Sequence, residues 1–349
     1  MIFRLLLLTL PLFGASAAVA QDLPVPTQTP GPYIIKVDYD ALYAMESPPE
    51  YEPFEVYGRF LLSVAMQQTP ISLDIFQPLP DHIEKSSDVV FKTVDGQPIG
   101  MDVYRDKTDS TPNPLILIIH GGYWKAGDKS AHQANAIEFI DMGYTVASVN
   151  YRLSETTKFP GNIEDIFEAI RFLTTHAEDY NVDPTRIATW GGSAGGHLSG
   201  FVGLAANSAD QTYNKGIDAS AIKAVISMYG MHDLTLPIQR EHPFTEQYIG
   251  APYEGSEDTY REASPIAHVD ADDPPVLLVH GSIDGSVSVQ NSDALAARLS
   301  DLDVTTVYDR VEGWPHAMDL FSPIGERTLW HVHRFLREHM PSDEMMAIK

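Results

Sequence analysis

The residue type and spacing that point most directly to chemistry surround Ser193. The segment Trp190 to His197 reads Trp-Gly-Gly-Ser-Ala-Gly-Gly-His, so Gly191 and Gly195 lie two places on either side of the serine. This Gly-x-Ser-x-Gly pattern follows a strand predicted over residues 186–190 and precedes a predicted helix. In that setting it predicts a tight, strained strand-to-helix turn that exposes the serine hydroxyl as a nucleophile. The alternative is a glycine-rich turn with an incidental serine.

A second glycine-containing segment can supply the hydrogen-bond donors that acyl transfer requires. His120-Gly121-Gly122-Tyr123-Trp124 directly follows a predicted strand. Two successive glycines let the backbone bend close to a substrate, so we expect the backbone N–H of Gly122 or Tyr123 to face the carbonyl oxygen. The backbone N–H of Ala194 is the other expected donor. His120 is expected to order this loop by hydrogen bonding, and a packed glycine turn is the alternative.

Asp284 is the predicted carboxylate of this site. Where a serine occupies such a turn, the carboxylate and the histidine follow it in that order along the chain. The strand predicted over residues 276–280 runs into Gly281-Ser282-Ile283-Asp284, which places Asp284 at the carboxyl edge of the sheet. Asp233 and Asp309, which follow the two neighbouring strands, are its rivals.

His316 is the predicted general base. It ends the segment Glu312-Gly-Trp-Pro-His, between the last predicted strand and the last long predicted helix. In this role it takes the Ser193 proton and later returns it to the leaving alcohol, while Asp284 orients the imidazole and stabilises its charged form. Together the three residues predict acyl transfer through an acyl-enzyme that water hydrolyses.

Several aromatic and histidine side chains are candidates for substrate contact. Trp124 follows the donor loop, His197 lies in the helix after Ser193, and Tyr248 lies in an interruption between the later strands; each can equally be a packing residue. Further candidates for an aromatic-lined entrance or a weaker substrate contact are Tyr123, Phe244, Tyr253, His232 and His268. The remaining histidines of predicted helices are expected to be packing or surface residues: His331, His333 and His339.

The elements that must position these residues alternate along the chain. Around Asp95-Gly96, alternating hydropathy predicts a two-stranded hairpin, and continuous apolar runs then predict buried strands separated by helices. The predicted strands cover residues 88–94, 99–104, 115–120, 145–150, 187–190, 222–229, 276–280 and 304–308. The predicted helices cover residues 131–142, 163–176, 194–206, 287–299 and 324–339. This order predicts an α/β fold with a mostly parallel eight-stranded sheet and helices on both faces.

The chain outside this alternation divides into shorter parts. Residues 231–273, between the sixth and seventh strands, are predicted to be an insertion over the carboxyl edge of the sheet, where ligands of open α/β sheets bind. Residues 21–87 are a proline-rich N-terminal extension with one amphipathic stretch, 54–68, that could form a helix. The catalytic domain is predicted over residues 88–340, and residues 341–349 form a C-terminal tail.

The first twenty residues predict export. One positive charge, Arg4, precedes the apolar run of residues 5–13, and Ala18-Val19-Ala20 has the small-x-small pattern of a signal-peptidase site. We therefore expect residues 1–20 to be a signal peptide cleaved near Ala20 and the mature protein to be secreted or periplasmic. An uncleaved anchor is the alternative, although the run is short for a stable membrane insertion and contains Pro11.

Composition limits the partners and cofactors. The 48 Asp and Glu residues against 23 Lys and Arg give a net charge of −25, which disfavours binding to nucleic acid and to anionic lipid. There are no cysteines, which excludes a disulfide framework, thiolate catalysis and cysteine metal sites. His-Glu-x-x-His spacing is absent, so no metal and no cofactor are expected. The expected partner is a small-molecule or carbohydrate ester; the sequence does not indicate an oligomeric state.

These motifs resemble the α/β-hydrolase superfamily, most of all the exported bifunctional feruloyl/acetyl-xylan-esterase-like group, related to the hormone-sensitive-lipase-like carboxylesterases. The similarity runs over residues 88–339 and includes Asn150-Tyr-Arg-Leu, Phe159-Pro160 and Ala263-Ser-Pro-Ile. In these segments Arg152 and Asp165 are expected to brace loops. The resemblance implies a serine carboxylesterase acting on acyl or aryl esters, including acetylated or feruloylated carbohydrate.

One departure leaves the substrate class open. Those esterases usually carry His-Gly-Gly-Gly at the donor loop, whereas this chain has Tyr123 as the fourth residue. His-Gly-Gly-Tyr-Trp is similar to the loop of arylformamidases, which use the same triad on an N-formyl amide, but the signal peptide argues against that cytosolic role. The motifs are also compatible with a serine exopeptidase or a non-catalytic binding scaffold, although a scaffold of that kind generally lacks a triad member or an oxyanion glycine.

Overall fold

The structure is a computed structural model that describes residues 39–55, 59–60, 77–206, 213–214 and 216–347. The predicted signal peptide, with its cleavage near Ala20, lies outside the described residues. So does most of the helix predicted over residues 54–68. Among the described helices, none is long and apolar enough to cross a membrane.

The core of the fold is one eight-stranded sheet in the order β1-β2-β4-β3-β5-β6-β7-β8. Its strands are β1 (Ile83–Val94), β2 (Gln97–Asp106), β3 (Asn113–Ile119), β4 (Thr145–Val149), β5 (Val182–Gly192), β6 (Ile222–Met228), β7 (Val276–Gly281) and β8 (Thr306–Val311). The pairs β1–β2 and β2–β4 are antiparallel, and all other neighbours are parallel. The predicted mostly parallel eight-stranded sheet is confirmed.

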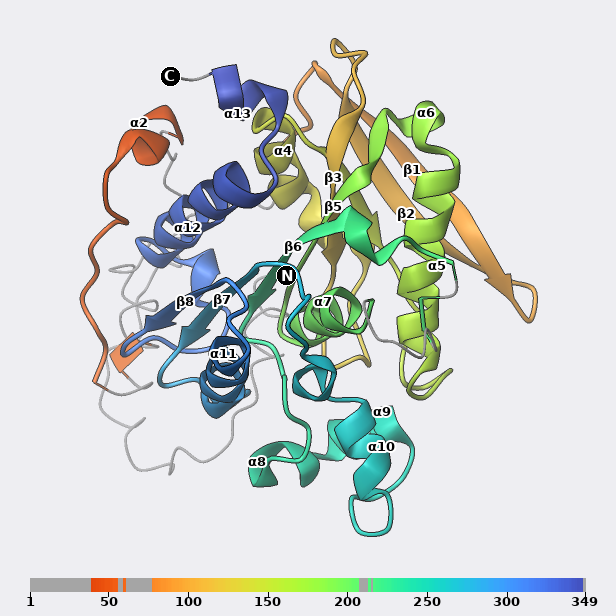
Figure 1. Cartoon of the computed structure of the whole chain (residues 1–349), viewed down its shortest axis with the longest axis vertical. Helices are drawn as coiled ribbons and strands as arrows, with labels where there is room; N and C mark the ends of the chain where they lie inside the picture. The colour runs from red at the N-terminus through yellow and green to blue at the C-terminus, as the bar shows by residue number, and fades with distance from the viewer. Residues whose placement is uncertain (1–38, 56–58, 61–76, 207–212, 215, 348–349) are drawn as a thin grey trace, which may run out of the picture. The chain divides into compact units, whose positions relative to one another are not determined.

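Helices cover both faces of this sheet because its central strands bury both sets of side chains. On β3, Leu115, Leu117 and Ile119 pack in one apolar cluster, and the alternate residues Ile116 and Ile118 pack in the other. The first cluster includes residues of α5 (Gly161–Thr175), α7 (Ala194–Ala205) and α11 (Gln290–Asp301). The second includes residues of α4 (Gln133–Asp141) and α12 (Ile324–His339). Figure 1 shows these two groups of helices on either side of the strands.

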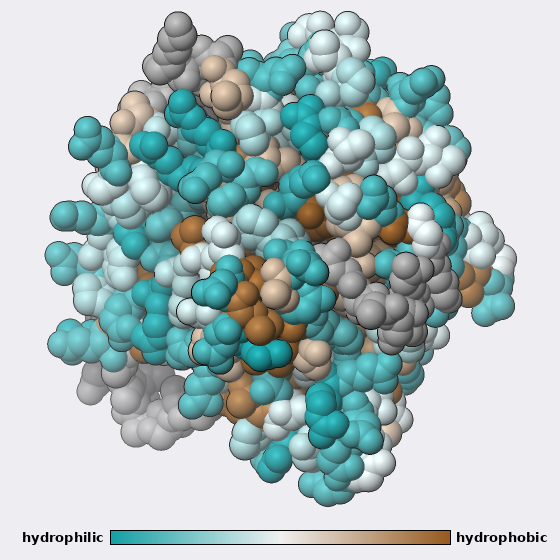
Figure 2. Space-filling model, viewed as in Figure 1, coloured by the Kyte–Doolittle hydropathy of each residue, from teal (hydrophilic) through white to brown (hydrophobic). Residues whose placement is uncertain are grey.

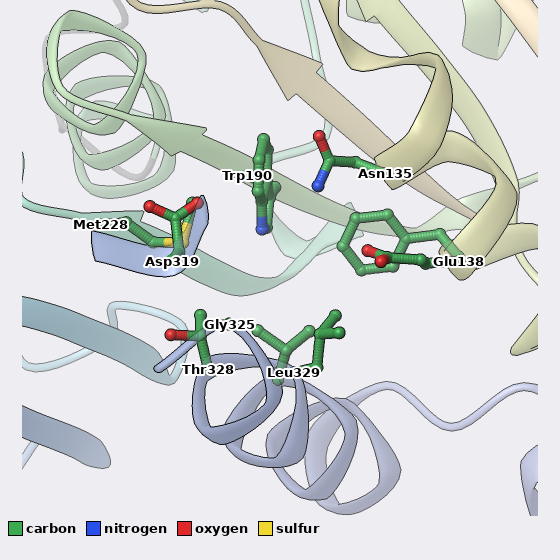
Figure 3. Close-up of a pocket in the computed structure, with 10 residues that line it drawn as sticks. Asn135, Glu138, Trp190, Met228, Asp319, Gly325, Thr328 and Leu329 are labelled. Carbon is green, nitrogen blue, oxygen red and sulfur yellow. The ribbon is translucent and has the colours of Figure 1, made fainter. Parts of the chain in front are cut away.

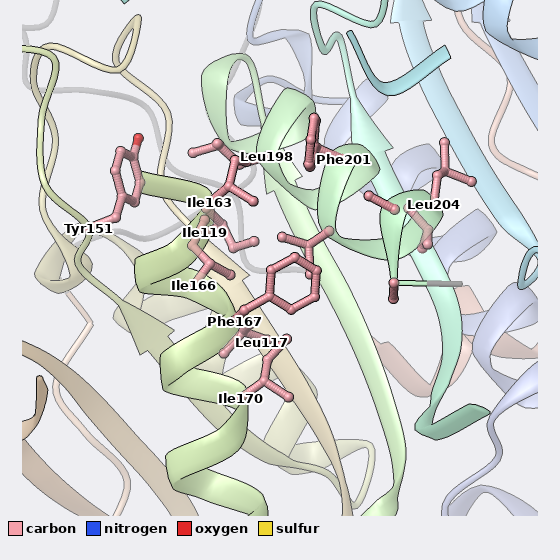
Figure 4. Close-up of a cluster of buried hydrophobic side chains, with 14 of the residues drawn as sticks. Leu117, Ile119, Tyr151, Ile163, Ile166, Phe167, Ile170, Leu198, Phe201 and Leu204 are labelled. Atoms are coloured by element: carbon pink, nitrogen blue, oxygen red, sulfur yellow. The ribbon is translucent and has the colours of Figure 1, made fainter. Parts of the chain in front are cut away.

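The packing between α5, α7 and the sheet is dense around Phe167. Figure 4 shows Ile163, Ile166, Phe167 and Ile170 of α5 directed toward β3 and α7, where Leu198 and Phe201 lie. On the outside of the molecule, hydrophilic residues cover most of the face in Figure 2. The helix that follows Ser193 is therefore fixed by apolar packing rather than by solvent-exposed contacts.

Strand and helix ends differ from the sequence prediction where pairing partners decide them. β1 begins at Ile83 rather than at residue 88, because Ile83 to Ser86 pair with Asp106 to Val103 of β2. β8 extends to Val311, since Val311 pairs with Gly281 of β7. In contrast, α12 has the predicted bounds. Part of the predicted tail forms a helix, α13 (Asp343–Ala347), and Met345 of this helix is buried.

The predicted insertion contains short helices. These are α8 (Pro237–Arg240), α9 (Pro243–Ile249), α10 (Glu257–Glu262) and the 3₁₀ turn η3 (Pro265–His268). They follow β6 and precede β7, and α8, α9 and α10 lie together in Figure 1. The remaining short elements are α2 (Tyr39–Ala44), α6 (Ala177–Tyr180) and the 3₁₀ turns η1 (Lys129–His132), η2 (Ala219–Ala221) and η4 (Met318–Leu320).

Candidate active site

Ser193 occupies the turn between β5 and α7. Its backbone has φ 60° and ψ −124°, a conformation that residues with a Cβ rarely adopt. The neighbours must be glycine: a Cβ on Gly191 would lie 2.4 Å from the carbonyl carbon of Gly195, and a Cβ on Gly195 would lie 2.0 Å from the carbonyl oxygen of Ile119. The turn therefore forms only with small residues on both sides, which is the physical reason for the Gly-x-Ser-x-Gly pattern.

The structure brings Ser193, His316 and Asp284 into one hydrogen-bonded row. His316 Nε2 lies 3.0 Å from Ser193 Oγ, and His316 Nδ1 lies 2.6 Å from Asp284 Oδ2. The Asp284 side chain is fully buried, whereas His316 is partly accessible at 13%. This is the arrangement in which an imidazole can accept the serine proton while a buried carboxylate fixes its orientation.

Asp284 is held as a carboxylate. Its Oδ1 accepts the backbone N–H groups of Ser286 and Val287 at 2.8 and 2.9 Å. Burial alone would raise its pKa, but the charge on His316 and hydrogen bonds from His280 and His316 outweigh burial and hold the pKa well below its usual range. Asp284 is therefore ionised across the neutral range, as the orienting group of such a row must be.

The rival carboxylates are engaged elsewhere. Asp233 accepts the backbone N–H and the hydroxyl of Thr235. Asp309 forms a two-point ion pair with Arg327, with both N–O distances at 2.7 Å. Neither carboxylate is in contact with His316 among the described contacts, which leaves Asp284 as the partner of the histidine.

The loop of residues 120–124 passes directly against the Ser193 turn. A Cβ on Gly121 would lie 2.8 Å from the carbonyl oxygen of Gly192 and 3.3 Å from Ser193 Cβ. Gly122, Tyr123 and Trp124 all have positive φ, at 115°, 53° and 56°. Among the described residues, no protein acceptor receives a hydrogen bond from the backbone N–H of Gly122, Tyr123 or Ala194. These are donors suited to a substrate oxyanion, and the positive end of α7 adds to them.

His120 orders this loop. Its Nδ1 lies 2.9 Å from the carbonyl oxygen of Gly121, its ring stacks on Tyr151, and the Tyr151 hydroxyl donates to the His120 carbonyl oxygen. Burial lowers the pKa of His120 to about 4, so it is neutral. Nearby, Arg152 and the fully buried Asp165 form an ion pair that braces the segment after β4.

The predicted substrate contacts of Trp124, His197 and Tyr248 are contradicted by the burial of these side chains. All three are at most 1% exposed, so in this structure they have no surface to offer a substrate. Trp124 stacks on Tyr248 at a ring distance of 4.3 Å and donates its indole N–H to His197 Nδ1. They instead form an aromatic support beneath the donor loop. Sequence alone could not separate the two roles, because burial of these side chains depends on α9 of the insertion.

The other histidines of the insertion contact protein groups. His232 is fully buried and lies 3.2 Å from Ser227 Oγ. His268 is half-buried, and its Nε2 bonds to the carbonyl oxygen of Glu262. Within the described part of the chain, no group of three or more His, Asp or Glu side chains has a metal-binding arrangement.

Residues 51–54 hold the loop that carries His316, a role that sequence reasoning missed. The backbone N–H of Phe54 donates to the Gly313 carbonyl oxygen at 3.1 Å, and Trp314 Nε1 donates to the Glu52 carbonyl oxygen at 3.1 Å. The Tyr51 hydroxyl accepts the backbone N–H of Glu312 at 2.9 Å. These contacts join parts of the chain about 260 residues apart. No local sequence pattern could have revealed them.

Sequence reasoning also missed the pair formed by Tyr229 and Asp319. The Tyr229 ring meets His316 edge-on at 4.6 Å, and its hydroxyl donates to Asp319 Oδ1 at 2.6 Å. Asp319 also lines a cavity of about 30 Å³ between α4, Trp190 and α12, drawn in Figure 3. None of the described residues that line this cavity belongs to the row of Ser193, Asp284 and His316. The cavity is therefore separate from the reacting atoms.

Comparisons with known proteins agree with this geometry. The BD-FAE family matches residues 101–299, more than half of the chain. Two relatives from Mycobacterium tuberculosis are the probable carboxylic ester hydrolase LipM, 31% identical over 64% of this chain, and the esterase LipC, 32% identical over 65%. The chain spans just over half of their length, 54% and 58%.

Solved structures share the fold. A truncated carbohydrate esterase from gut microbiota has a TM-score of 0.59 at 27% identity, over 68% of this chain and 91% of its own. A butyrate-bound esterase of Thermogutta terrifontis has a TM-score of 0.62 at 22% identity, over 74% and 94%, and shows likeness of fold alone. With the serine turn, the buried carboxylate and the histidine loop in place on this sheet, the chain belongs to the BD-FAE family and has the α/β-hydrolase fold.

Proposed function

We propose that the protein is a serine carboxylesterase that uses Ser193, His316 and Asp284. The single observation that carries this proposal is the row of 3.0 Å and 2.6 Å contacts from Ser193 Oγ through His316 to Asp284, beside the backbone donors of the 120–124 loop and Ala194. Ester hydrolysis is also the activity in the names of the relatives LipM and LipC.

In the proposed reaction, Ser193 Oγ attacks the ester carbonyl while His316 Nε2 takes its proton. The backbone N–H groups of Gly122 or Tyr123 and of Ala194 stabilise the oxyanion, each contributing roughly 3 kcal/mol in the transition state. His316 then returns the proton to the leaving alcohol, and an acyl-enzyme remains. Water, deprotonated by the same histidine, releases the acid and regenerates Ser193.

The substrate class proposed is acyl or aryl esters, including esters of carbohydrate. Tyr123, in the loop of residues 120–124, stacks on His242 at a ring distance of 5.0 Å and lies 5.1 Å from Phe244. All three side chains are half-buried, so part of each ring faces solvent. Burial lowers the pKa of His242, so its imidazole is neutral at pH 7, and Lys125 Nζ lies over the Phe244 ring at 5.2 Å. Such a wall favours a flat acyl or alcohol group beside the reacting carbonyl.

We also propose that the chain is exported and that the mature protein begins after Ala20. The proposal rests on the n-region, apolar run and small-x-small site of residues 1–20. N-terminal sequencing of the protein recovered from the culture medium or periplasm tests it. A start near Gln21 is expected, and an intact Met1 on membranes would overturn it.

The experiment that tests the proposed activity is a substrate panel applied to the wild-type enzyme and to one variant. We expect turnover of short p-nitrophenyl esters and methyl ferulate, and loss of about 10⁴-fold or more in kcat for Ser193→Ala. Acetylated xylan tests the carbohydrate esters, and N-formylkynurenine tests the formamidase alternative suggested by Tyr123. Preferred turnover of the formyl amide would overturn the ester assignment, and near-normal turnover by Ser193→Ala would overturn the nucleophile.

The aromatic wall has its own matched test. Phe244→Ala should lower kcat/KM for methyl ferulate several-fold, about 1 kcal/mol for a lost ring contact, and leave p-nitrophenyl acetate nearly unchanged. Tyr253→Leu is the control, because Tyr253 packs on Tyr260 in the same insertion. Equal effects of the two variants on both substrates would contradict the role of Phe244.

A further inference from the structure

His280 is a second histidine in contact with Asp284. It lies near the end of β7, is fully buried, and its Nε2 lies 3.2 Å from Asp284 Oδ2 and 3.1 Å from the carbonyl oxygen of Val287. Its Nδ1 lies 2.8 Å from the hydroxyl oxygen of Ser292, in the first turn of α11. β7 and α11 pack against each other, as Figure 1 shows.

The partners of the two ring nitrogens determine the tautomer. Nε2 faces two acceptors, a carboxylate and a carbonyl, so it carries the proton and donates. Nδ1 then accepts the hydroxyl proton of the buried Ser292. Ser292 thus selects the tautomer that directs an N–H toward Asp284.

This geometry makes Asp284 Oδ2 the acceptor of two imidazole N–H groups. One comes from His316 at 2.6 Å; the other, from His280 at 3.2 Å, is shared with the Val287 carbonyl oxygen at 3.1 Å, while Oδ1 receives two backbone N–H groups. A carboxylate with four donors has little freedom to rotate, and the second imidazole also takes up part of the negative charge on Oδ2. Both effects act on His316, which contacts Asp284 through Nδ1 and Ser193 through Nε2.

We infer that His280, with its tautomer set by Ser292, is a positioning residue that fixes Asp284 and so sets the orientation and basicity of His316 toward Ser193. This rests on the proposed serine hydrolase function. It deepens that function by adding an imidazole that never touches the substrate but adjusts the general base.

Other titratable groups face this pair and must be separated from His280 in a pH experiment. Tyr123 and Tyr229 face Asp284, Asp319 faces His316, and His232 faces His280. Burial raises the pKa of both tyrosines above the usual value of 10 and lowers the pKa of His232, so these three stay neutral between about pH 6 and 8. Burial raises the pKa of Asp319, so Asp319→Asn is a necessary control.

The test compares His280→Gln with His280→Leu in the full chain. Gln can place an amide N–H close to the position of Nε2, and its amide oxygen can accept a hydrogen bond, whereas Leu can do neither. The donor to Asp284 is therefore kept in one variant and absent from the other. Titration of active sites with paraoxon counts the folded enzyme in each preparation.

We expect His280→Leu to lower kcat about 10- to 100-fold with KM within about twofold, because misoriented catalytic groups cost rate rather than binding. The acid limb of the kcat/KM profile should move to higher pH, because Asp284 without the His280 donor stabilises protonated His316 more strongly. His280→Gln should return the acid limb of kcat/KM to its wild-type pH and restore most of kcat. The low-field proton resonance of His316 Nδ1–H should shift in His280→Leu and return in His280→Gln, a readout that needs no substrate.

The inference is overturned if His280→Leu and His280→Gln have the same pH profile and the same low-field resonance. His280 would then be a packing residue whose loss affects stability alone. Failure of the proposed function gives a different result: hydrolysis by the wild-type enzyme would not depend on Ser193. An acid limb that moves only in Asp319→Asn would assign the effect to Asp319 and also overturn the inference.

Discussion

The indole N–H of Trp124 donates a hydrogen bond of 3.1 Å to His197 Nδ1, and both side chains are buried. Trp124 ends the donor loop, and His197 lies in the first turn of α7, after Ser193. His197 Nε2 in turn bonds to the carbonyl oxygen of Ala263 at 2.8 Å. The bond therefore ties the loop that supplies the proposed oxyanion donors to the helix that follows the proposed nucleophile.

Trp124→Phe should show what this bond contributes. The ring contact with Tyr248 is largely kept, but the buried Nδ1 of His197 loses its donor, so we expect the free energy of unfolding to fall by about 1–2 kcal/mol. Because the donor loop can then shift, kcat should fall about tenfold with little change in KM. Trp330→Phe is the control, since it removes an exposed indole bond to the Met45 carbonyl oxygen. Equal kcat values for the two variants would contradict the positioning role.

Gly122→Ala should disrupt the donor loop. Gly122 has φ 115°, and an added Cβ would lie 2.2 Å from the carbonyl oxygen of Ala126. The loop must move, so we expect kcat to fall about 10²- to 10³-fold, as when an oxyanion donor is lost. Gly96→Ala is the matched control, because Gly96 also has positive φ, 77°, but has open space around it. Steady-state kinetics on a p-nitrophenyl ester compare the two; full activity of Gly122→Ala would exclude this loop as a donor.

Stability should fall in mild acid because of buried neutral histidines. Burial lowers the pKa of His197 and His120 from 6.5 to about 4. Between these values the unfolded chain binds more protons than the folded chain, so each histidine favours unfolding by up to about 1.4 kcal/mol per pH unit as pH falls. Above pH 6.5 both histidines are neutral in the folded and in the unfolded chain, so neither lowers the stability there.

Urea midpoints measured at about pH 7 and pH 5 test this prediction. His120→Gln should reduce the difference between the two midpoints, because it removes one of the two groups. A midpoint that is the same at both pH values in the wild-type protein would show that these histidines are protonated in the folded state.

The segment of residues 51–54 should affect catalysis although it lies outside the BD-FAE match. Tyr51→Phe removes the acceptor for the Glu312 N–H and loosens the loop before His316. We expect kcat to fall between about two- and tenfold at unchanged KM, because only the general base is displaced. Tyr43→Phe is the control, since Tyr43 stacks on His333 of α12. If Tyr51→Phe lowers thermal stability but leaves kcat at the wild-type value, the segment is a structural brace only.

The sequence was informative wherever a residue type is required locally. Close backbone contacts at one turn require Gly191 and Gly195, so the turn can be predicted from the sequence. The strands β3 and β7 are buried on both faces, so each is a continuous apolar run that predicts a buried strand. The order of strands also placed Asp284 and His316 at the edge of the sheet where Ser193 lies. Local geometry and topology were sufficient for these residues.

Other features depend on contacts between distant segments. Trp124 and His197 lie beside motifs that face substrate in the prediction, and Tyr248 lies in the insertion. All three are buried because the insertion packs against the donor loop. The contact of Trp314 with Glu52 joins residues 262 positions apart, and the contact of Ser292 with the His280 ring forms because α11 packs against β7. Tertiary packing decides these roles, and no spacing rule along the chain encodes it.

Covalent labelling tests most directly whether Ser193 is a nucleophile activated by His316. The enzyme is treated with paraoxon, and peptides are mapped by mass spectrometry while loss of esterase activity is followed. We expect one diethylphosphoryl group, on Ser193, appearing in step with inactivation, absent from Ser193→Ala and formed far more slowly in His316→Asn. Inactivation with the label on another residue, or full ester hydrolysis by Ser193→Ala, would contradict the proposed mechanism.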